Sequence, residues 1–283
     1  MIIGAGQDTA HRAPKKNTIY CENCLDTMSR MPDDFVDLVV TSPPYDDFRA
    51  YNGYAFDFDS IAIELYRIIK TGCCIVWIVG DKTEKGTESG TSFRQALRFM
   101  ELGFSLNDTM IYEKTNPVPQ PTSKRYAQAF EYMFVLCKGL VSTFNPINEE
   151  TLDYYKLWKN KGKTNRNKNG INRDKACNWN KTKKISNIFK YSLSRWSNDC
   201  QSKHPATFPE QLANDHILSW SNLGDLVYDP FLGSGTTAKT ALVNGRNFIG
   251  SEISEEYCRI AEERIHALRI PAQNTLEEKK WMM

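Results

Sequence analysis

The chain has 283 residues, of which 41% are hydrophobic and 25% are charged. This composition excludes a disordered or fibrous protein and is sufficient for one large domain with an insertion. The net charge of +2 does not by itself indicate an acidic partner. No apolar stretch is long enough to span a bilayer, and the first residues lack the apolar core of a signal peptide. We therefore expect a cytoplasmic protein without a membrane partner.

The basic residues are concentrated in one segment. Between Lys156 and Lys203 there are fourteen basic and two acidic residues, a net charge of +12. The rest of the chain carries 22 basic and 32 acidic residues, a net charge of −10. The near-neutral total is therefore the sum of two oppositely charged parts.

Apolar periodicity predicts alternating strands and helices along most of the chain. We expect strands at 35–41, 73–79, 108–113, 132–137, 226–229 and 247–251. We expect helices at 58–70, 92–102, 209–220, 236–243 and 254–268. In helix 92–102, the spacing of Phe93, Ala96, Leu97 and Met100 places these apolar side chains on one face.

The periodic pattern fails between 145 and 203, where Asn, Lys, Arg and Ser dominate. This segment is predicted to be an insertion, because alternating strands and helices on both sides of it indicate one α/β sandwich with a mostly parallel sheet. We expect two halves of this domain at 1–144 and 204–270, the basic insertion at 145–203 and a tail at 271–283.

The eight cysteines lie mostly in apolar runs, which is typical of buried free thiols. Cys21 and Cys24 form a lone CxxC pair, and the adjacent Cys73 and Cys74 cannot supply the second half of a zinc ribbon. We therefore expect structural thiols, no disulfide framework and no metal site.

A glycine turn joins a predicted strand to a predicted helix at 229–237, DPFLGSGTT. Glycines in such a turn let the backbone approach a ligand, and the helix N-terminus offers free N–H groups to an anion. Glu252 ends the next predicted strand, where an acidic side chain can accept hydrogen bonds from both hydroxyls of a ribose. Since no Lys follows the second glycine as it does in a phosphate-binding loop, the sequence predicts an adenosine-containing ligand.

A second motif, Ser42-Pro43-Pro44-Tyr45, follows the predicted strand at 35–41. Prolines fix the backbone and donate no N–H, so their carbonyl groups remain available as acceptors in a fixed geometry. Together with the Ser42 hydroxyl and the Tyr45 ring, they can hold an amino group attached to an aromatic base.

These two motifs resemble those of the DNA amino-methyltransferases, which transfer a methyl group from S-adenosylmethionine to N4 of cytosine or N6 of adenine. The order of the motifs is similar to that of the circularly permuted β class, and the resemblance covers residues 17–140 and 203–268. The segment 204–209, HPATFP, resembles a motif that flanks the cofactor in this family. The resemblance implies a Rossmann-like methyltransferase sandwich with an inserted target-recognition region.

The resemblance also implies roles for individual residues. Glu252 would hold the ribose, and Asn23 and Phe208 would lie near the adenine. In this chain, Asn23 occupies the position of an acidic residue that the family often has. Asp229 would contact the methionine amino group or order the turn, and His204 would flank the cofactor or begin a helix. The remaining residues expected at the amino-acid end of the cofactor are Phe231, Gly233, Ser234, Gly235 and Thr236.

The catalytic residues implied are Ser42, Pro43, Pro44 and Tyr45, with Tyr45 stacking on a base flipped out of the duplex. Double-stranded DNA is the expected partner of the basic insertion, in which Trp158, Trp179, Phe189, Tyr191 and Trp196 are interleaved. The basic residues expected to contact DNA are Lys161, Lys163, Arg166, Arg173, Lys181, Lys183, Lys184 and Arg195.

The sequence leaves several alternatives open. Within the family, Ser at the first motif position is associated with N4-cytosine enzymes, and Asp or Asn with N6-adenine enzymes, so we favour N4 of cytosine and keep N6 of adenine as the alternative. An RNA or protein-glutamine methyltransferase and a non-enzymatic nucleic-acid-binding module are less favoured. A homodimer and a cognate restriction endonuclease of a restriction-modification system are further partners that the resemblance suggests.

Overall fold

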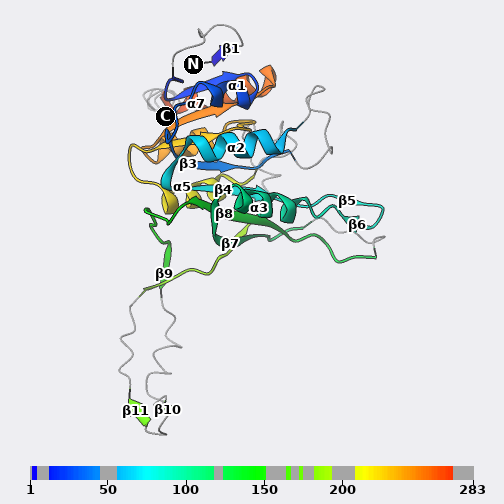
Figure 1. Ribbon diagram of the computed structural model, residues 1–283, viewed down its shortest axis with the longest axis vertical. Helices are drawn as coiled ribbons and strands as arrows, with labels where there is room; N and C mark the ends of the chain where they lie inside the picture. Colours follow the sequence, from blue (N-terminus) through cyan, green and yellow to red (C-terminus); the bar gives the residue numbers. More distant parts are fainter. Residues whose placement is uncertain are drawn as a thin grey trace, which may run out of the picture. The chain divides into compact units, whose positions relative to one another are not determined.

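The computed structural model (Figure 1) describes residues 2–4, 13–44, 56–117, 124–150, 164–166, 172–174, 182–192 and 208–269. The chain divides into two compact units. The larger comprises Met1–Asn145 and Asn187–Met283, and the smaller comprises Pro146–Ser186.

Within the described part of the larger unit, nine strands form one sheet in the order β1-β2-β15-β14-β3-β4-β8-β7-β13. Only the pairings of β8 with β4 and with β7 are antiparallel, which confirms the expected mostly parallel sheet. In sheet order, the bounds are β1 Ile2–Gly4, β2 Thr18–Cys21, β15 Asn247–Ser251, β14 Leu226–Asp229, β3 Val36–Thr41, β4 Ile69–Val79, β8 Phe130–Lys138, β7 Phe104–Lys114 and β13 Ile188–Tyr191.

Helices cover both faces of this sheet. The crossovers β3–α2–β4 and β14–α6–β15 run in opposite directions along the sheet, so their common right-handedness places α2 and α6 on opposite faces. Helix α1 packs against α2, whereas α6 packs against both α5 and α7. None of the helices in the described ranges is long and apolar enough to cross a membrane. The bounds are α1 Cys24–Ser29, α2 Phe58–Ile68, α3 Thr91–Glu101, α5 Glu210–Trp220, α6 Thr236–Val243 and α7 Glu255–Arg269.

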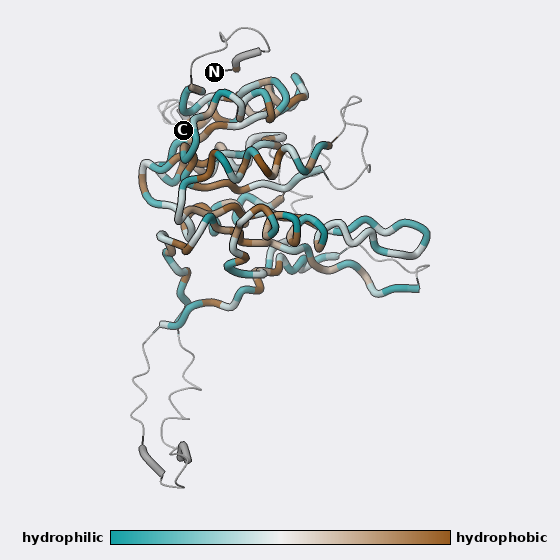
Figure 2. The backbone as a smooth tube through the Cα atoms, in the orientation of Figure 1, coloured by the Kyte–Doolittle hydropathy of each residue, from teal (hydrophilic) through white to brown (hydrophobic). Residues whose placement is uncertain are grey.

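The core lies around β3, β4 and β8, which are mostly hydrophobic along their lengths (Figure 2). Trp77 of β4 is fully buried and packs edge-on against Phe58 and Phe99 from α2 and α3. Its indole N–H donates to Gln95 Oε1 at 2.8 Å, so the one polar atom of the indole has a partner.

Helix α3 confirms the predicted helix but buries a different face. Phe93, Leu97 and Met100 are 51%, 60% and 44% exposed, whereas Gln95 and Phe99 are buried. Gln95 is drawn inward because it accepts the Trp77 indole N–H. Of the four residues predicted to share one apolar face, Ala96 is buried at 7% exposed, whereas the other three lie on the surface of this unit.

Strand β13 corrects the prediction that all of 145–203 is an insertion. Ile188–Tyr191 pairs in parallel with β7 at the edge of the main sheet. Phe189 and Tyr191 are only 8% and 7% exposed, and the Tyr191 hydroxyl donates to Asp215 of α5 at 2.7 Å. These two aromatic side chains stabilise the core and are not available to bind DNA.

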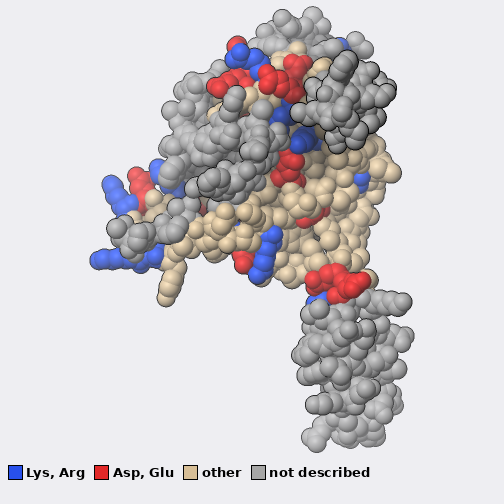
Figure 3. Space-filling view, turned by 180° about the vertical axis from the view of Figure 1, so that it is seen from behind, with Lys and Arg blue, Asp and Glu red and all other residues tan. Residues whose placement is uncertain are grey.

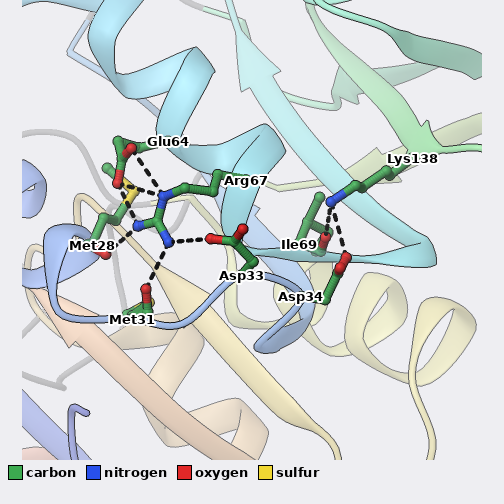
Figure 4. Close-up of polar contacts among 8 residues, drawn as sticks. All are labelled: Met28, Met31, Asp33, Asp34, Glu64, Arg67, Ile69 and Lys138. Atoms are coloured by element: carbon green, nitrogen blue, oxygen red, sulfur yellow. Dashed lines mark hydrogen bonds and ion pairs between the residues drawn. The ribbon is translucent and has the colours of Figure 1, made fainter. Parts of the chain in front are cut away.

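Arg67 near the end of α2 ties this helix to the segment between α1 and β3 (Figure 4). Its guanidinium donates to the carbonyl groups of Met28 and Met31, both at 2.7 Å, and to the carboxylates of Asp33 and Glu64. The hydrogen bond to Glu64, opposed in part by burial, raises the pKa of Arg67 above its usual value. Arg67 thus fixes the lead-in to β3, the strand that ends at the second motif.

The remaining strands form small hairpins. In the larger unit, β5 (Thr83–Glu84) pairs with β6 (Thr87–Glu88) just after β4. In the smaller unit, β9 (Asn148–Glu150) pairs with β12 (Thr182–Lys184), and β10 (Thr164–Arg166) pairs with β11 (Asn172–Asp174), both in antiparallel orientation.

Candidate active site

The two sequence motifs meet at one edge of the sheet. Strands β3 and β14 are neighbours and parallel, with Leu38 opposite Val227, so their carboxyl ends lie together. The hydroxyl of Thr41, at the end of β3, donates to Asp229 Oδ1, at the end of β14, at 2.7 Å. This buried hydrogen bond joins the start of the Ser-Pro-Pro segment to the start of the glycine turn.

Two residues of the glycine turn adopt backbone conformations that favour glycine. Gly233 and Gly235 have φ values of 52° and 84°, in the left-handed region that favours glycine. A Cβ at Gly235 would lie 2.8 Å from Ala261 Cβ on α7, so no larger residue fits at this position. Gly235 is the N-cap of α6, and the N–H groups in the first turn of that helix point toward the same edge of the sheet.

Glu252 directly follows β15, as predicted, and is 8% exposed. Its carboxylate accepts from Gly233 N at 2.8 Å and from Ser254 N at 2.9 Å, one bond to each oxygen. Burial raises the pKa of Glu252 above its usual value, against the effect of these bonds. A carboxylate has about four acceptor positions, so Glu252 retains capacity for a further hydrogen bond.

Asp229 is buried and orders the turn. Besides the Thr41 hydroxyl, its Oδ1 accepts the Phe231 N–H at 3.0 Å. Burial raises the pKa of this carboxyl to about 6, and the hydrogen bonds from Thr41 and Thr237 act in the opposite direction. Of the two roles predicted for Asp229, the structure shows the second.

The Ser-Pro-Pro segment follows a strand whose neighbour, β4, carries aromatic side chains. Pro43 is buried, Ser42 and Pro44 are half-buried, and Tyr45 lies outside the described residues. Thr41 is paired with Trp77 of β4, whose ring centroid is 6.3 Å from that of Phe231 in the glycine turn. Phe231 of the turn thus packs against the strand that pairs with β3.

Asn23 and Phe208 are described by the structure, whereas His204 lies outside the described residues. Asn23 follows β2 and is the N-cap of α1, where its side chain accepts from Leu25 N at 2.9 Å. Phe208 is half-buried and immediately precedes Pro209, the N-cap of α5. Asn23 therefore has a structural role as an N-cap, and its place near the adenine stays a prediction.

The sequence interpretation missed Arg264 of α7. Its Nη1 donates to the carbonyl and the hydroxyl of Ser234 at 2.6 and 3.0 Å, and to the Thr236 hydroxyl at 3.3 Å. Arginine in an amphipathic helix is usually exposed, so the only signal available was its i+3 spacing from Ala261, which contacts Gly235.

Only some of the predicted DNA-binding residues are described. Lys183 and Lys184 are exposed on β12, and Lys183 forms an ion pair with Glu149 at 3.0 Å. Arg166 and Arg173 belong to β10 and β11, respectively. Figure 3 shows acidic and basic side chains intermingled on the described part of one face. The other predicted residues lie outside the described ranges: Lys161, Lys163, Lys181 and Arg195.

A comparison with models of protein families identifies the family of this chain. The model of the family described as DNA methylase, for N6 and N4 enzymes, matches residues 36–263. The chain belongs to the DNA methylase family. Members of this family use S-adenosylmethionine, and the match spans both motifs and the segment between them.

Individual relatives support this assignment. The orphan methyltransferase M.BamHII of Bacillus amyloliquefaciens is 50% identical over an alignment of 239 residues, which covers 81% of this chain and 88% of that protein. The type II methyltransferase M.HinfI of Haemophilus influenzae is 27% identical over 295 residues, covering 92% of this chain and 71% of that protein.

Solved structures confirm the methyltransferase sandwich. The PvuII DNA methyltransferase (cytosine-N4-specific) superposes with a TM-score of 0.69 at 20% identity, over 96% of this chain and 93% of its own. The M1.HpyAVI–SAM complex superposes with a TM-score of 0.56 at 23% identity, over 87% and 98% of the two chains. At these identities, the likeness concerns the fold.

The raised pKa of Asp229 predicts a pH dependence of stability. The folded protein binds this proton more tightly than the unfolded chain, so the free energy of unfolding should fall as pH rises from about 4 to about 6. Asp229→Asn keeps an oxygen acceptor for Thr41 and Phe231 but stays neutral. Between these pH values, the free energy of unfolding of wild type should fall by on the order of 3 kcal/mol more than that of the variant. Urea unfolding measures this difference.

The control is Asp59→Asn at an exposed position of α2, which should leave the wild-type pH dependence unchanged. Parallel stability curves for wild type and Asp229→Asn would show that Asp229 has the same proton affinity in the folded and unfolded chain.

Proposed function

We propose that this DNA methylase transfers a methyl group from S-adenosylmethionine to the exocyclic amino group of a base flipped out of double-stranded DNA, with N4 of cytosine as the target. The observation that carries this proposal is the hydrogen bond between Thr41 and Asp229, which places the Ser-Pro-Pro segment beside the glycine turn. Ser42 at the first motif position supports cytosine. The cytosine-N4 specificity named for the PvuII enzyme, which shares the fold, points the same way.

The cofactor would lie along the carboxyl edge of β2, β15 and β14. Glu252 binds the ribose through its carboxylate, which retains acceptor capacity beyond its bonds to the backbone. Phe208 and Asn23 lie near the adenine. The amino-acid end contacts the turn around Gly233 and Gly235, where the absence of side chains lets the ligand approach the backbone.

Ser42 and the Pro43 carbonyl bind the amino group of the target base. The amine is a poor nucleophile because its lone pair is delocalised into the ring, and two acceptors for its hydrogens favour a pyramidal nitrogen. The cofactor supplies an electrophilic methyl group on sulfur. The nitrogen lone pair forms the new N–C bond, the C–S bond breaks with its electron pair going to sulfur, and the nitrogen loses one proton to solvent.

The basic segment would bind the DNA backbone. Its lysine and arginine side chains neutralise phosphates, while Tyr45 stacks on the flipped base. Lys183 and Lys184 lie exposed on β12, a hairpin strand that presents both to solvent. Because Phe189 and Tyr191 belong to the core, the aromatic contacts with DNA fall to the tryptophans of this segment.

The exposed apolar stripe on α3 supports a homodimer. Phe93, Leu97 and Met100 form a continuous row at helical spacing. If a second copy packs its α3 antiparallel across Leu97, Arg94 of each copy lies close to Glu101 of the other. The charges that flank the stripe are thus complementary about a two-fold axis, as a two-fold interface requires.

N6 of adenine remains the alternative target, since the family contains enzymes of both kinds. A cognate restriction endonuclease stays a prediction. The relative that is 50% identical is itself described as an orphan methyltransferase.

Ser42→Ala should reduce the rate of methyl transfer by at least about 100-fold, because the amine loses an acceptor used in the transition state. The dissociation constant of S-adenosylmethionine, measured by calorimetry, should remain within about twofold of wild type. A nucleoside digest of DNA methylated by the wild-type enzyme should contain N4-methylcytosine by mass spectrometry.

Ser29→Ala, at an exposed serine that ends α1, is the matched control and should be fully active. Full activity of Ser42→Ala would refute the catalytic role, and N6-methyladenine in the digest would select the alternative target.

Lys183→Ala/Lys184→Ala should weaken DNA binding. The negative slope of log K against log salt should become less steep by about 2, one unit for each lost phosphate contact. Fluorescence anisotropy at several salt concentrations measures this slope. Lys15→Ala/Lys16→Ala, at two exposed positions before β2, is the control and should keep the wild-type slope. Equal slopes for both double variants would mean that β12 does not contact DNA.

Leu97→Asp should convert the dimer to a monomer, because it places a charge at the centre of the apolar stripe. Analytical ultracentrifugation measures the change in mass. Leu223→Asp, at a residue 78% exposed in the loop before β14, should remain dimeric. A wild-type protein that sediments as a monomer at micromolar concentration would contradict the proposed interface.

A further inference from the structure

Arg264 lies beneath the glycine turn, with only 6% of its surface exposed. Its Nη1 donates to both oxygens of Ser234, the carbonyl at 2.6 Å and the hydroxyl at 3.0 Å, and to the Thr236 hydroxyl at 3.3 Å. Ser234 was expected to contact the cofactor, but its oxygens face α7. The guanidinium is therefore a hydrogen-bond partner of both the main chain and the side chain of Ser234.

The same guanidinium also reaches the beginning of α5. Arg264 Nη2 donates to Glu210 Oε1 at 2.5 Å, and Lys239 of α6 donates to that same oxygen at 2.8 Å. Glu210 is the first residue of α5 and lies two positions after Phe208. One carboxylate oxygen thus links the helix that follows the adenine-flanking segment to the helix that begins at the glycine turn.

We propose that Arg264 is a positioning residue for S-adenosylmethionine, acting through Ser234 and Glu210. By holding both, it fixes the distance between the turn that receives the amino-acid end and the segment of Phe208 that lies by the adenine. The planar guanidinium can satisfy these two sites at once in a rigid geometry, which a lysine ammonium cannot. This inference rests on the proposed arrangement of the cofactor along the sheet edge.

The energetics also indicate a specific geometric role. A buried charge carries a desolvation cost of several kcal/mol that a packed apolar residue would avoid. Two cations share one carboxylate here, and the buried Arg264 Nε has no partner among the described residues. Such an arrangement is not optimised for stability alone, so what it adds is the fixed orientation of the groups around it.

Arg264→Lys tests the proposal because it keeps the charge and shortens the reach. Calorimetry should show a dissociation constant for S-adenosylmethionine about tenfold above wild type, which is a loss of about 1.4 kcal/mol. The rate of methyl transfer at saturating cofactor should stay within about twofold, so the effect appears in KM and not in kcat. Arg259→Lys, at an exposed arginine of the same helix, is the matched control and should bind the cofactor as wild type does.

A second variant keeps the test decisive if Arg264→Lys does not fold. Glu210→Gln retains an oxygen acceptor at a side chain that is 37% exposed, and the folded variant should raise the same dissociation constant about threefold. A double variant should show less than the product of the two effects, because the residues act through one contact.

The proposal is overturned if the folded Arg264→Lys and Glu210→Gln variants both bind the cofactor within about twofold of wild type. It is equally overturned if kcat falls while the dissociation constant is unchanged. If the wild-type protein did not bind S-adenosylmethionine at all, that result would instead contradict the proposed function itself.

Discussion

The pairing of β3 with β14 is the constraint on which the site depends. These strands are neighbours in the sheet although the hydrogen-bonded residues at their ends, Thr41 and Asp229, are 188 positions apart in the chain. Parallel neighbours end at the same edge, so any residues placed just after them must meet. The hydroxyl–carboxylate bond then fixes their relative height. Two segments that meet at one edge of the sheet can thus be encoded 188 positions apart in the sequence.

This constraint leaves the intervening chain free to vary. In the smaller unit, Asn148–Glu150 pairs with Thr182–Lys184 in antiparallel orientation, so the chain between these two strands begins and ends at neighbouring positions. A segment that leaves and returns at one place adds little strain whatever its length, because closing a longer loop costs only slightly more entropy. The charge of the chain follows the same division, with an acidic catalytic body and a basic segment between its two halves.

The central strands and the two motifs could be predicted because they depend on local signals, such as continuous apolar runs and glycine or proline at fixed positions. Strand β13 could not, because an edge strand with Lys190 between the buried Phe189 and Tyr191 resembles a polar loop until its partner β7 is known. The buried face of α3 was wrong for a related reason. Gln95 is inside because Trp77 needs an acceptor, which no helical periodicity can reveal. The burial of Arg264 could not be predicted for the same reason, because it depends on the partners of this side chain, Ser234 and Glu210.

The electrostatics of the site point to the charge of its ligand. Asp229 and Glu252 are both buried carboxylates at adjacent strand ends, and burial raises the pKa of each. Their mutual repulsion adds to the upward shift for Glu252. A positive ligand beside them lowers both pKa values and recovers part of this cost, whereas a neutral ligand does not. S-adenosylmethionine carries a sulfonium charge that its demethylated product lacks. Two buried carboxylates at one edge of the sheet therefore suit a ligand that brings positive charge to the turn.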